Sequence, residues 1–267
     1  FKSLIIADQK PKTKESNLVT FLSEGSLKYI SKVLETENIF PESEHIEKLD
    51  CEHWVSKKET KLEFENPNKS TLGKIVPNVK IDEIFNNKIL SNSKHIHISD
   101  HYEITPKIDD NRITINDKSG EKKSAALLFY SASSLEHDLL NSFEFVEKKL
   151  DQVAISASVN VQRKQHNSAY QLFTHDGPIA LLPVQGNEAS VVWSLEKNSS
   201  ILKLEQNDLE SQLNELFKKH VSELKIKNIQ TQKLSFSYAK NMYQDKIVLI
   251  GNVAHNIHPI AGQGFNL

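Results

Sequence analysis

The sequence predicts a mixed α/β fold in which two subdomains interleave along the chain. Apolar runs without alternation lie near residues 4–7, 126–130 and 246–250, a pattern typical of parallel strands that are covered on both faces. Residues 151–195 instead alternate between apolar and polar side chains, which predicts an antiparallel sheet with one open face. At 267 residues, the chain is long enough for one large domain or two smaller ones.

The first part of the chain is predicted to contain a buried strand and two helices. FKSLIIAD, residues 1–8, reads as a short strand that ends in an acid. Residues 79–90 have a helix-like pattern, whereas residues 41–71 are polar and mixed. Residues 25–36 place four apolar side chains on one helical face: Leu27, Ile30, Val33 and Leu34.

A small antiparallel meander is predicted next. Its strands are HIHISD, YEITPKID and NRITIND, and turns at 109–111 and 118–120 separate parts of it. AALLFY, residues 125–130, then predicts a second buried strand.

The second half of the chain is predicted to build most of the antiparallel sheet. GPIALLPV and ASVVWSL are two of its strands and are joined by a Gly-Asn turn, and KIVLI predicts the last strand of the chain. Residues 151–162 place apolar side chains on one face: Val153, Ile155, Ala157, Val159 and Val161. Residues 207–224 predict a helix with one apolar stripe: Leu209, Leu213, Leu216, Phe217, Val221 and Leu224.

Composition narrows the classes of function. The net charge of −2 gives no electrostatic reason to expect nucleic acid, and Arg112 and Arg163 are the only arginines. Cys51 is the only cysteine, so an intramolecular disulfide and a zinc site with two cysteine ligands from this chain are excluded. No run approaches the ~18 apolar residues of a transmembrane helix. The chain begins at Phe1 rather than at a methionine.

The most informative stretch is GNVAHNIHPIAGQGFNL, residues 251–267, which follows a predicted buried strand. A strand followed by glycine, a polar turn and a helix start is a geometry that binds ligands. Glycine lets the backbone approach a ligand closely, and free N–H groups at a helix start bind anions or polar edges. His255 and His258 are spaced i, i+3, but no HExxH pattern or nearby acid supports a metal site.

This closing segment resembles the flavin-dependent aromatic hydroxylases of ubiquinone biosynthesis, the 2-polyprenyl-6-methoxyphenol hydroxylase family. The signature of that family runs Gly-Asp-Ala-Ala-His, two residues, His-Pro, a hydrophobic residue, Ala-Gly-Gln-Gly, a hydrophobic residue and Asn-Leu. AYQLFTHDGPIALLPV with VVWSL, and LGKIVPN at 72–78, are similar to further segments of the family. The signature is matched at Gly251, Ala254, His255, His258, Pro259, Ala261, Gly262, Gln263, Gly264, Asn266 and Leu267.

The resemblance implies a fold as in aromatic hydroxylases, with an FAD-binding Rossmann-like domain interleaved with an antiparallel-sheet substrate domain. Residues 1–40, 72–150 and 233–267 would form the FAD-binding domain, without its first βα unit. Residues 41–71 and 151–232 would form the substrate domain.

The resemblance also implies that FAD is the cofactor. Asp8 matches the acid that holds the adenosine ribose, although it could equally be a solvated strand end. No catalytic side chain and no metal are expected, because the chemistry in this family belongs to the cofactor. The flavin-side candidates are Gly251, Asn252, Pro259, Gly262, Gln263, Gly264 and Asn266.

The sequence departs from the family pattern in three places. Asn252 stands where the family has the aspartate that contacts the ribityl chain, and losing a charged hydrogen bond costs roughly 1.5–3 kcal/mol. Ser131-Ala132 stands where the family has Asp-Gly. The GxGxxG fingerprint is absent; if Asp8 ends the second strand of a βαβ unit, that loop lies upstream of Phe1. We therefore expect the chain to be a fragment that is inactive by itself.

The activity that the resemblance implies is an FAD-dependent monooxygenase that hydroxylates a polyprenylated phenol in ubiquinone biosynthesis. NAD(P)H would reduce the flavin, oxygen would form a flavin hydroperoxide, and its distal oxygen would be transferred to the ring. We expect the substrate pocket between the 151–195 sheet and the Pro259–Gly264 loop. The expected location is cytoplasmic and peripheral to the inner membrane, with contact to the membrane or to a ubiquinone-biosynthesis complex.

An alternative is a non-catalytic relative that keeps the hydroxylase fold as a binding or scaffold subunit. Asn252 and the Ser131-Ala132 pair favour it, because both acids on the flavin side are lost. The intact Gly262-Gln263-Gly264 loop argues against it.

Overall fold

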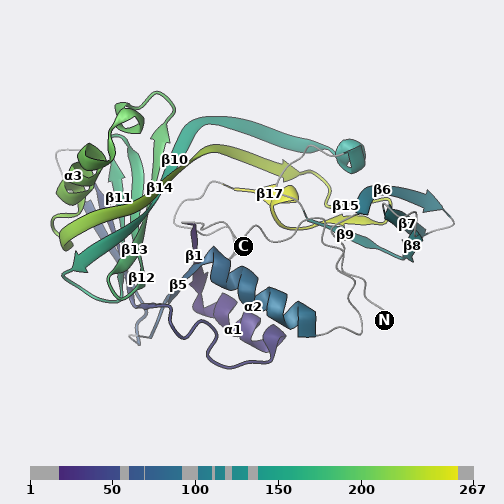
Figure 1. Ribbon diagram of the computed structural model, residues 1–267, viewed down its shortest axis with the longest axis horizontal. Coiled ribbons are helices and arrows are strands. Elements are labelled where there is room, and N and C mark those ends of the chain that lie inside the picture. Colours follow the sequence, from purple (N-terminus) through teal and green to yellow (C-terminus); the bar gives the residue numbers. More distant parts are fainter. Residues whose placement is uncertain are drawn as a thin grey trace. The chain divides into compact units, whose positions relative to one another are not determined.

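The structure is a computed structural model that describes residues 18–54, 60–68, 70–91, 102–109, 112–117, 122–131 and 138–257. The described residues form two compact units. The first takes its residues from Asn86–Leu150 and Ser235–His258, and the second from Lys14–Phe85 and Asp151–Leu234. Two long strands, β10 (Phe145–Arg163) and β14 (Val221–Ala239), contribute to both units (Figure 1).

The units divide the chain differently from the predicted domains in one respect. The described residues of 18–40 and 72–85 belong to the second unit, together with the large antiparallel sheet. The assignment of an FAD-binding and a substrate domain stays a prediction. The first predicted strand, at residues 1–8, lies outside the described residues.

An eight-stranded sheet takes most of its strands from the second unit, while β17 and the end of β14 belong to the first. Its order is β17-β14-β10-β13-β12-β11-β3-β4, and all its neighbours with described register are antiparallel except β11 and β3, which are parallel. The predicted Gly-Asn turn joins β12 to β13, and Gly186 has a φ of 53° there. The remaining strands are β3 (Lys48–His53), β4 (Thr60–Glu65), β11 (Ser168–Thr174), β12 (Gly177–Gln185), β13 (Glu188–Glu196) and β17 (His255–Asn256).

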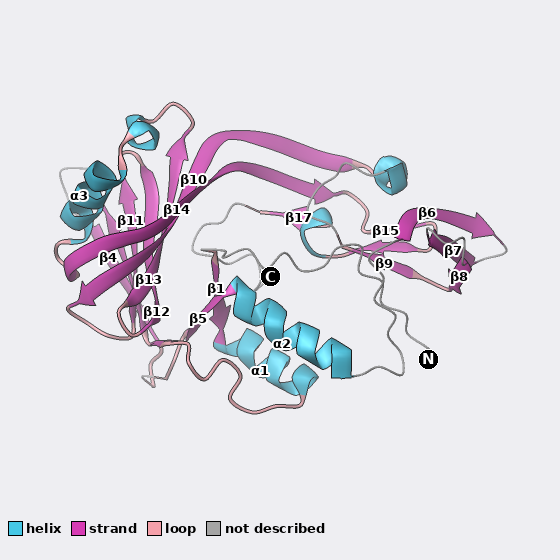
Figure 2. Cartoon of the chain, viewed as in Figure 1, coloured by secondary structure: helices cyan, strands magenta, loops and turns pink. Residues whose placement is uncertain are grey.

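Helix α3 (Gln206–Phe217) covers one face of this sheet (Figure 2). Leu209, Leu213 and Phe217 of the helix are buried against apolar residues of the strands. The sheet side of this core includes the predicted face of β10 and the facing residues of β11, β12 and β13: Ile155, Ala157, Val159, Val161, Tyr170, Leu172, Ile179, Leu181, Val191, Trp193 and Leu195. The 3-10 helix η2 (Ser200–Lys203) adds Ile201.

The prediction that the helix reaches residue 224 was wrong. Helix α3 ends at Phe217, and Val221 and Leu224 lie on strand β14. The Asn214 side chain fixes this change of direction, because its Oδ1 accepts from the N–H of Leu224 at 2.8 Å and its Nδ2 donates to the Leu224 carbonyl at 2.8 Å. Val221 and Leu224 are still buried with the α3 stripe, which is why the helical pattern continued into the strand.

The prediction of one open sheet face was also wrong for the middle of the sheet. Ala169, Ala180 and Leu182 point away from α3 and are buried against Ile46 and Ile75. These last two residues come from a three-stranded antiparallel sheet of order β1-β5-β2. Its strands are β1 (Val19–Ser23), β2 (His45–Ile46) and β5 (Gly73–Pro77).

Helices α1 (Glu24–Leu34) and α2 (Asn78–Ser91) match the two helices predicted for the first part of the chain. Ser23 caps α1, since its hydroxyl accepts a hydrogen bond from the N–H of Ser26 at 3.2 Å. The two helices lie side by side (Figure 2) and share one core with β1 and β5. Its main members are Leu22, Leu27, Ile30, Leu34, Val76 and Ile81.

The first unit contains two small sheets. Two strands of the predicted meander are confirmed, β6 (Tyr102–Asp109) and β7 (Arg112–Asp117), and they pair in an antiparallel sheet of order β6-β7-β8. The third strand of this sheet, β8 (Lys122–Ala125), was not predicted. HIHISD lies outside the described residues. The other sheet has the order β15-β16-β9, with β9 (Leu128–Tyr130), β15 (Tyr243–Gln244) and β16 (Ile247–Leu249).

Strands β9 and β16 pair in parallel, as the two apolar runs predicted. Only one face of this pair is well buried, however. Ile247, Leu249 and Tyr130 pack against the 3-10 helix η1 (Asp138–Ser142) and Phe143, whereas Phe129 is 62% exposed. The prediction that β9 is covered on both faces is therefore wrong among the described residues.

Candidate functional site

The carboxyl ends of the parallel strands β9 and β16 bring two sequence-predicted positions together. Tyr130 is paired with Leu249, and the N–H of Ile250 donates to the Tyr130 carbonyl at 2.9 Å. The next residues, Ser131 and Gly251, therefore emerge at the same edge of the sheet. In open α/β sheets, ligands bind outside the carboxyl ends of the parallel strands.

Gly251 lies beside the Ser131 side chain. A Cβ atom on residue 251 would lie 3.1 Å from the Ser131 Oγ, which is tighter than an ordinary van der Waals contact. Gly251 also has a φ of 66°, in the left-handed region that residues with a Cβ adopt at a cost. The backbone conformation therefore favours glycine at this position, and a larger residue would also displace the Ser131 hydroxyl by a few tenths of an ångström.

Asn252 follows in the short 3-10 helix η3 (Gly251–Val253) and is exposed, like Ser131 and Gly251. Val253 and Ala254 after it are buried in the core of the first unit and anchor the segment. Within the described part of the chain, the N–H groups of the exposed residues Gly251 and Asn252 donate to no protein acceptor. The edge therefore presents backbone donors, one amide side chain and one hydroxyl to solvent.

The other predicted cofactor contacts cannot be placed. Asp8, Pro259, Gly262, Gln263, Gly264 and Asn266 lie outside the described residues, as do Ala132 and His258. His255 is in β17, where it pairs with Tyr238 of β14. No group of three or more His, Cys, Asp or Glu side chains in the described ranges is arranged to hold a metal ion.

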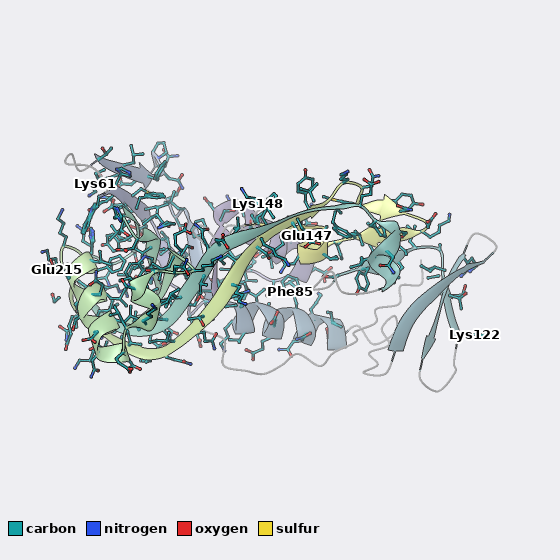
Figure 3. All side chains as sticks on the ribbon, turned by 90° about the horizontal axis from the view of Figure 1, so that it is seen from above. Lys61, Phe85, Lys122, Glu147, Lys148 and Glu215 are labelled. Carbon is teal, nitrogen blue, oxygen red and sulfur yellow. The ribbon has the colours of Figure 1, made fainter. Side chains whose placement is uncertain are left out.

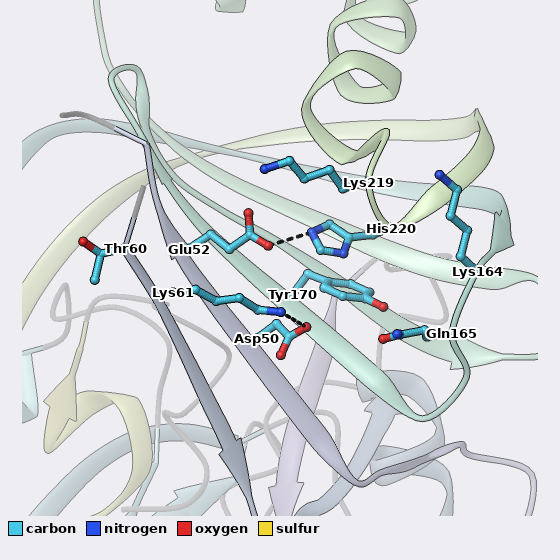
Figure 4. Close-up of a pocket in the computed structure, with 9 residues that line it drawn as sticks. All are labelled: Asp50, Glu52, Thr60, Lys61, Lys164, Gln165, Tyr170, Lys219 and His220. Atoms are coloured by element: carbon cyan, nitrogen blue, oxygen red, sulfur yellow. Dashed lines mark ion pairs between the residues drawn. The ribbon is translucent and has the colours of Figure 1, made fainter. Parts of the chain in front are cut away.

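A second set of polar residues, which the sequence analysis did not single out, lines a pocket in the second unit. The pocket has a volume of about 480 Å³ and lies at the β11-β3-β4 end of the large sheet (Figure 4). Figure 3 shows one of its lining residues, Lys61, on the edge strand β4. The lining residues are Asp50, Glu52, Thr60, Lys61, Lys164, Gln165, Tyr170, Lys219 and His220.

A sequence signal for these residues existed in the polar segment 41–71. Charged residues alternate with apolar ones at a period of two in both LysLeuAspCysGlu (48–52) and LysLeuGluPheGlu (61–65). This alternation predicts two strands with one charged face. The partners of that face, Tyr170 and His220, are more than 100 residues away in the sequence, so the alternation alone does not reveal the pocket.

Comparison with protein families shows which family contains the segment with Gly251 and Asn252. The family described as the FAD binding domain matches residues 133–267, which are 135 of the 267 residues. The chain belongs to this family. The match includes β16, Gly251 and Asn252, and the family's cofactor is FAD.

Two curated proteins are similar in sequence to part of the chain. Ubiquinone hydroxylase UbiL of Rhodospirillum rubrum is 31% identical over 118 residues, which cover 43% of this chain and 28% of that protein. The 3-demethoxyubiquinol 3-hydroxylase of Escherichia coli K12 is 32% identical over 112 residues, which cover 41% of this chain and 29% of that protein. The matched part thus spans under a third of the length of these two relatives.

A solved structure shares the fold of the whole chain. The p-nitrophenol 4-monooxygenase PnpA of Pseudomonas putida DLL-E4 superimposes with a TM-score of 0.74, covering 98% of this chain and 69% of that one at 10% identity. This likeness confirms the predicted fold class, an interleaved α/β fold as in aromatic hydroxylases. Among the described residues, none of the helices has the length and apolar character needed to cross a membrane.

The described residues at the β9 and β16 edge fit an FAD molecule. A Cβ on Gly251 would fill the space beside Ser131, so the glycine keeps the backbone open at the strand end. The side chains of Ser131 and Asn252 are exposed and neutral, and they offer hydrogen bonds without a charge. This donor and acceptor set suits the hydroxyl-rich, uncharged ribityl part of the cofactor.

Proposed function

We propose that the chain is the larger part of an FAD-dependent monooxygenase that hydroxylates a polyprenylated phenol in ubiquinone biosynthesis. The observation that carries the proposal is the meeting of Ser131 and Gly251 at the carboxyl ends of two parallel strands, in a member of the FAD binding domain family. The similarity to two ubiquinone hydroxylases supports the substrate class.

In this proposal the protein binds and positions, while the cofactor supplies the chemistry. When bound and reduced by NAD(P)H, FAD activates oxygen for transfer to an electron-rich ring. Gly251 leaves space for the cofactor, and Asn252 and Ser131 hydrogen-bond to it. We further propose that Asp8 holds its ribose and that Pro259, Gly262, Gln263, Gly264 and Asn266 contribute to the flavin side.

The chemistry of the proposed substrate indicates where the protein would act. A polyprenylated phenol is water-insoluble, so we propose that the protein acts in the cytoplasm at the surface of the inner membrane or within a ubiquinone-biosynthesis complex. The substrate pocket would lie between the 151–195 sheet and the Pro259–Gly264 loop. The similarity to hydroxylases does not favour a non-catalytic scaffold subunit.

The test is an assay of the full-length protein with FAD, NADPH and a short-chain polyprenylated phenol. We expect a product heavier by one oxygen atom, with label from ¹⁸O₂, and less product from the Gly251→Ala variant when FAD is limiting, because its FAD binding is about tenfold or more weaker. Stoichiometric FAD without any hydroxylated product would disprove the substrate class. Absence of FAD from the full-length protein would disprove the flavoenzyme itself and support the scaffold alternative.

A further inference from the structure

The pocket of the second unit lies on the face of the large sheet that carries α3. Tyr170 pairs with Asp50 of β3, so their side chains point to the same face. Tyr170 belongs to the core that packs against α3, whereas its neighbour Ala169 belongs to the core on the opposite face. Helix α3 covers the centre of its face, and the pocket opens beside the turn that follows the helix, where Lys219 and His220 lie.

The two buried acids of the pocket already have partners. The Asp50 carboxylate lies 3.2 Å from the Lys48 Nζ and 3.3 Å from the Lys61 Nζ. Glu52 accepts a hydrogen bond from the Trp54 Nε1 at 2.9 Å. Its other oxygen lies 3.2 Å from the His220 Nε2, without the alignment of a hydrogen bond (Figure 4). These contacts compensate the negative charge at the base of the pocket.

Several hydrogen-bond donors of the pocket are left over. The Tyr170 side chain is only 1% exposed, and its hydroxyl makes no well-aligned hydrogen bond within the described part of the chain. Such a group is unfavourable unless something binds it. Burial raises the pKa of Tyr170, although the Ser168 hydroxyl opposes the shift, so the oxygen keeps its proton and remains a donor.

Lys164 adds a positive charge that no described acid neutralises. Its Nζ donates to the Lys218 carbonyl at 2.6 Å, and no carboxylate in the described ranges lies within ion-pair distance. Lys219 lies at the same rim, with its Nζ 5.3 Å from the centre of the Trp54 ring. Figure 4 shows the Tyr170 hydroxyl pointing toward the side of the pocket that Lys164 and Gln165 form.

The lining charges therefore favour an anion. Lys48 and Lys61 already compensate Asp50, whereas Lys164 contacts only a backbone carbonyl among the described residues. Burial lowers the pKa of His220, which favours the neutral imidazole. The volume of about 480 Å³ is within the range of small-molecule sites. A ligand with an oxyanion at one end would satisfy the Tyr170 hydroxyl and balance the Lys164 charge.

We propose that this pocket binds a small organic anion through a carboxylate or phosphate group, which accepts hydrogen bonds from Tyr170 and Lys164. All nine lining residues belong to the second unit, whereas Ser131, Gly251 and Asn252 belong to the first. The site thus shares no residue with the proposed FAD contacts and does not depend on the proposed function.

The test is isothermal titration calorimetry of the full-length protein at low ionic strength, with three probes. Benzoate and inorganic phosphate represent the two oxyanions, and benzamide is a neutral molecule of the same shape as benzoate. We expect saturable binding of benzoate, of phosphate or of both, and none of benzamide. The oxyanion that binds identifies the source, and added salt should weaken its binding.

Two variants and one control locate the site. Tyr170→Phe and Lys164→Gln should each weaken binding of that oxyanion about tenfold, because each removes one donor to a charged group. Lys225→Gln, which removes a lysine whose side chain is 68% exposed on β14, should leave it unchanged. Because Tyr170→Phe removes only an unpartnered hydroxyl, the urea midpoint of unfolding should not fall.

Three results would overturn the proposal. The first is the absence of saturable binding by both oxyanions, and the second is equal binding of benzamide and benzoate. The third is unchanged oxyanion binding in both Tyr170→Phe and Lys164→Gln. A lower urea midpoint for Tyr170→Phe would show that the hydroxyl serves a structural contact and would remove Tyr170 from the site. The readout requires neither bound FAD nor hydroxylase activity.

Discussion

The Oγ of Ser131 lies 3.1 Å from the position that a Cβ on Gly251 would occupy. These residues are 120 positions apart in the sequence, and the parallel pairing of β9 with β16 brings them together. Each is a place where the family resemblance predicted a cofactor contact. Their meeting supports the alignment of both positions with the flavin motifs, even though the acids of those motifs are replaced.

The first prediction concerns the glycine. Gly251→Ala should weaken FAD binding by about tenfold or more, because a methyl group would fill the space beside Ser131. It should also lower the free energy of unfolding by about 1–2 kcal/mol, because the φ of residue 251 is left-handed. Fluorescence titration of the full-length apoprotein with FAD and urea denaturation measure the two effects.

Gly186→Ala is the matched control for this experiment. Gly186 has a φ of 53°, but no atom lies within 4 Å of the position of a Cβ. It should therefore lower the unfolding free energy to a similar extent and leave FAD affinity unchanged. Ser131→Ala combined with Gly251→Ala should recover part of the stability lost in the single variant. Equal FAD affinities for the two glycine variants would contradict the proposed role of Gly251.

The second prediction concerns the missing charge. Asn252→Asp should tighten FAD binding about tenfold or more, because a carboxylate accepts a stronger hydrogen bond from a ribityl hydroxyl than an amide does. Asn198→Asp, at an exposed position, adds the same charge elsewhere and should have no effect. If both variants bind FAD as the parent protein does, Asn252 does not contact the cofactor. The measurement is the same fluorescence titration.

Much of the fold followed from periodicity in the sequence. Helices α1 and α2, the pair of strands β6 and β7 and the sheet face of β10 repeat at 3.6 or 2 residues, and local patterns of this kind report directly on burial. The end of α3 could not be predicted in this way. Val221 and Leu224 bury against the same core from a strand, so burial continues while the backbone changes.

The candidate sites were predicted unevenly for a related reason. Gly251 and Asn252 belong to a contiguous motif, and such a motif is readable without the fold. The anion pocket joins β3, β4 and β11 with the residues after β10 and the turn after α3, and its signal is distributed over five segments. Only the parallel pairing of Asp50 with Tyr170 reveals that these segments share one face.

The third prediction concerns an ion pair within the second unit. Arg163 donates to both oxygens of Glu44, at 2.5 and 2.7 Å, and also to the Gly186 carbonyl. The Arg163 side chain is 2% exposed, so an unpaired guanidinium there is costly. Glu44→Gln should lower the free energy of unfolding by about 1.5–3 kcal/mol, as measured by urea denaturation at neutral pH.

An exposed ion pair provides the comparison. Lys227 and Glu188 also approach to 2.5 Å, but about half of each side chain is exposed. Glu188→Gln should therefore lower the free energy of unfolding by under about 1 kcal/mol. Burial by itself would raise the pKa of Glu44. The hydrogen bonds from Arg163 and from the Asn167 N–H outweigh this effect, so the pKa lies below its usual value of 4.5. The stability from this pair is therefore complete above about pH 4.5 and is lost as the pH falls through the pKa in the folded protein. Equal losses for the two glutamine variants would contradict the importance of burial.

The fourth prediction concerns His220, whose ring is stacked on Tyr170 with centroids 4.0 Å apart. Burial lowers the pKa of His220 below its usual 6.5, although the nearby Glu52 and Asp50 carboxylates oppose the shift. Below pH 6.5 the unfolded chain binds a proton at this position that the folded chain resists, so the free energy of unfolding should fall as the pH decreases. Above pH 6.5 the contribution of His220 is complete and independent of pH.

His220→Gln tests this sign directly, because glutamine keeps a polar group and does not titrate. Urea denaturation between pH 6.5 and 4.5, above the range in which Glu44 loses its contribution, should show a smaller loss of stability in His220→Gln than in the parent protein. His175→Gln, in the exposed turn between β11 and β12, should leave the pH dependence unchanged. A steeper loss in His220→Gln would mean that Glu52, 3.2 Å away, stabilises a protonated His220 more than burial disfavours it. In that case the ring would carry a positive charge in the folded protein, and the pocket would attract anions more strongly as the pH falls.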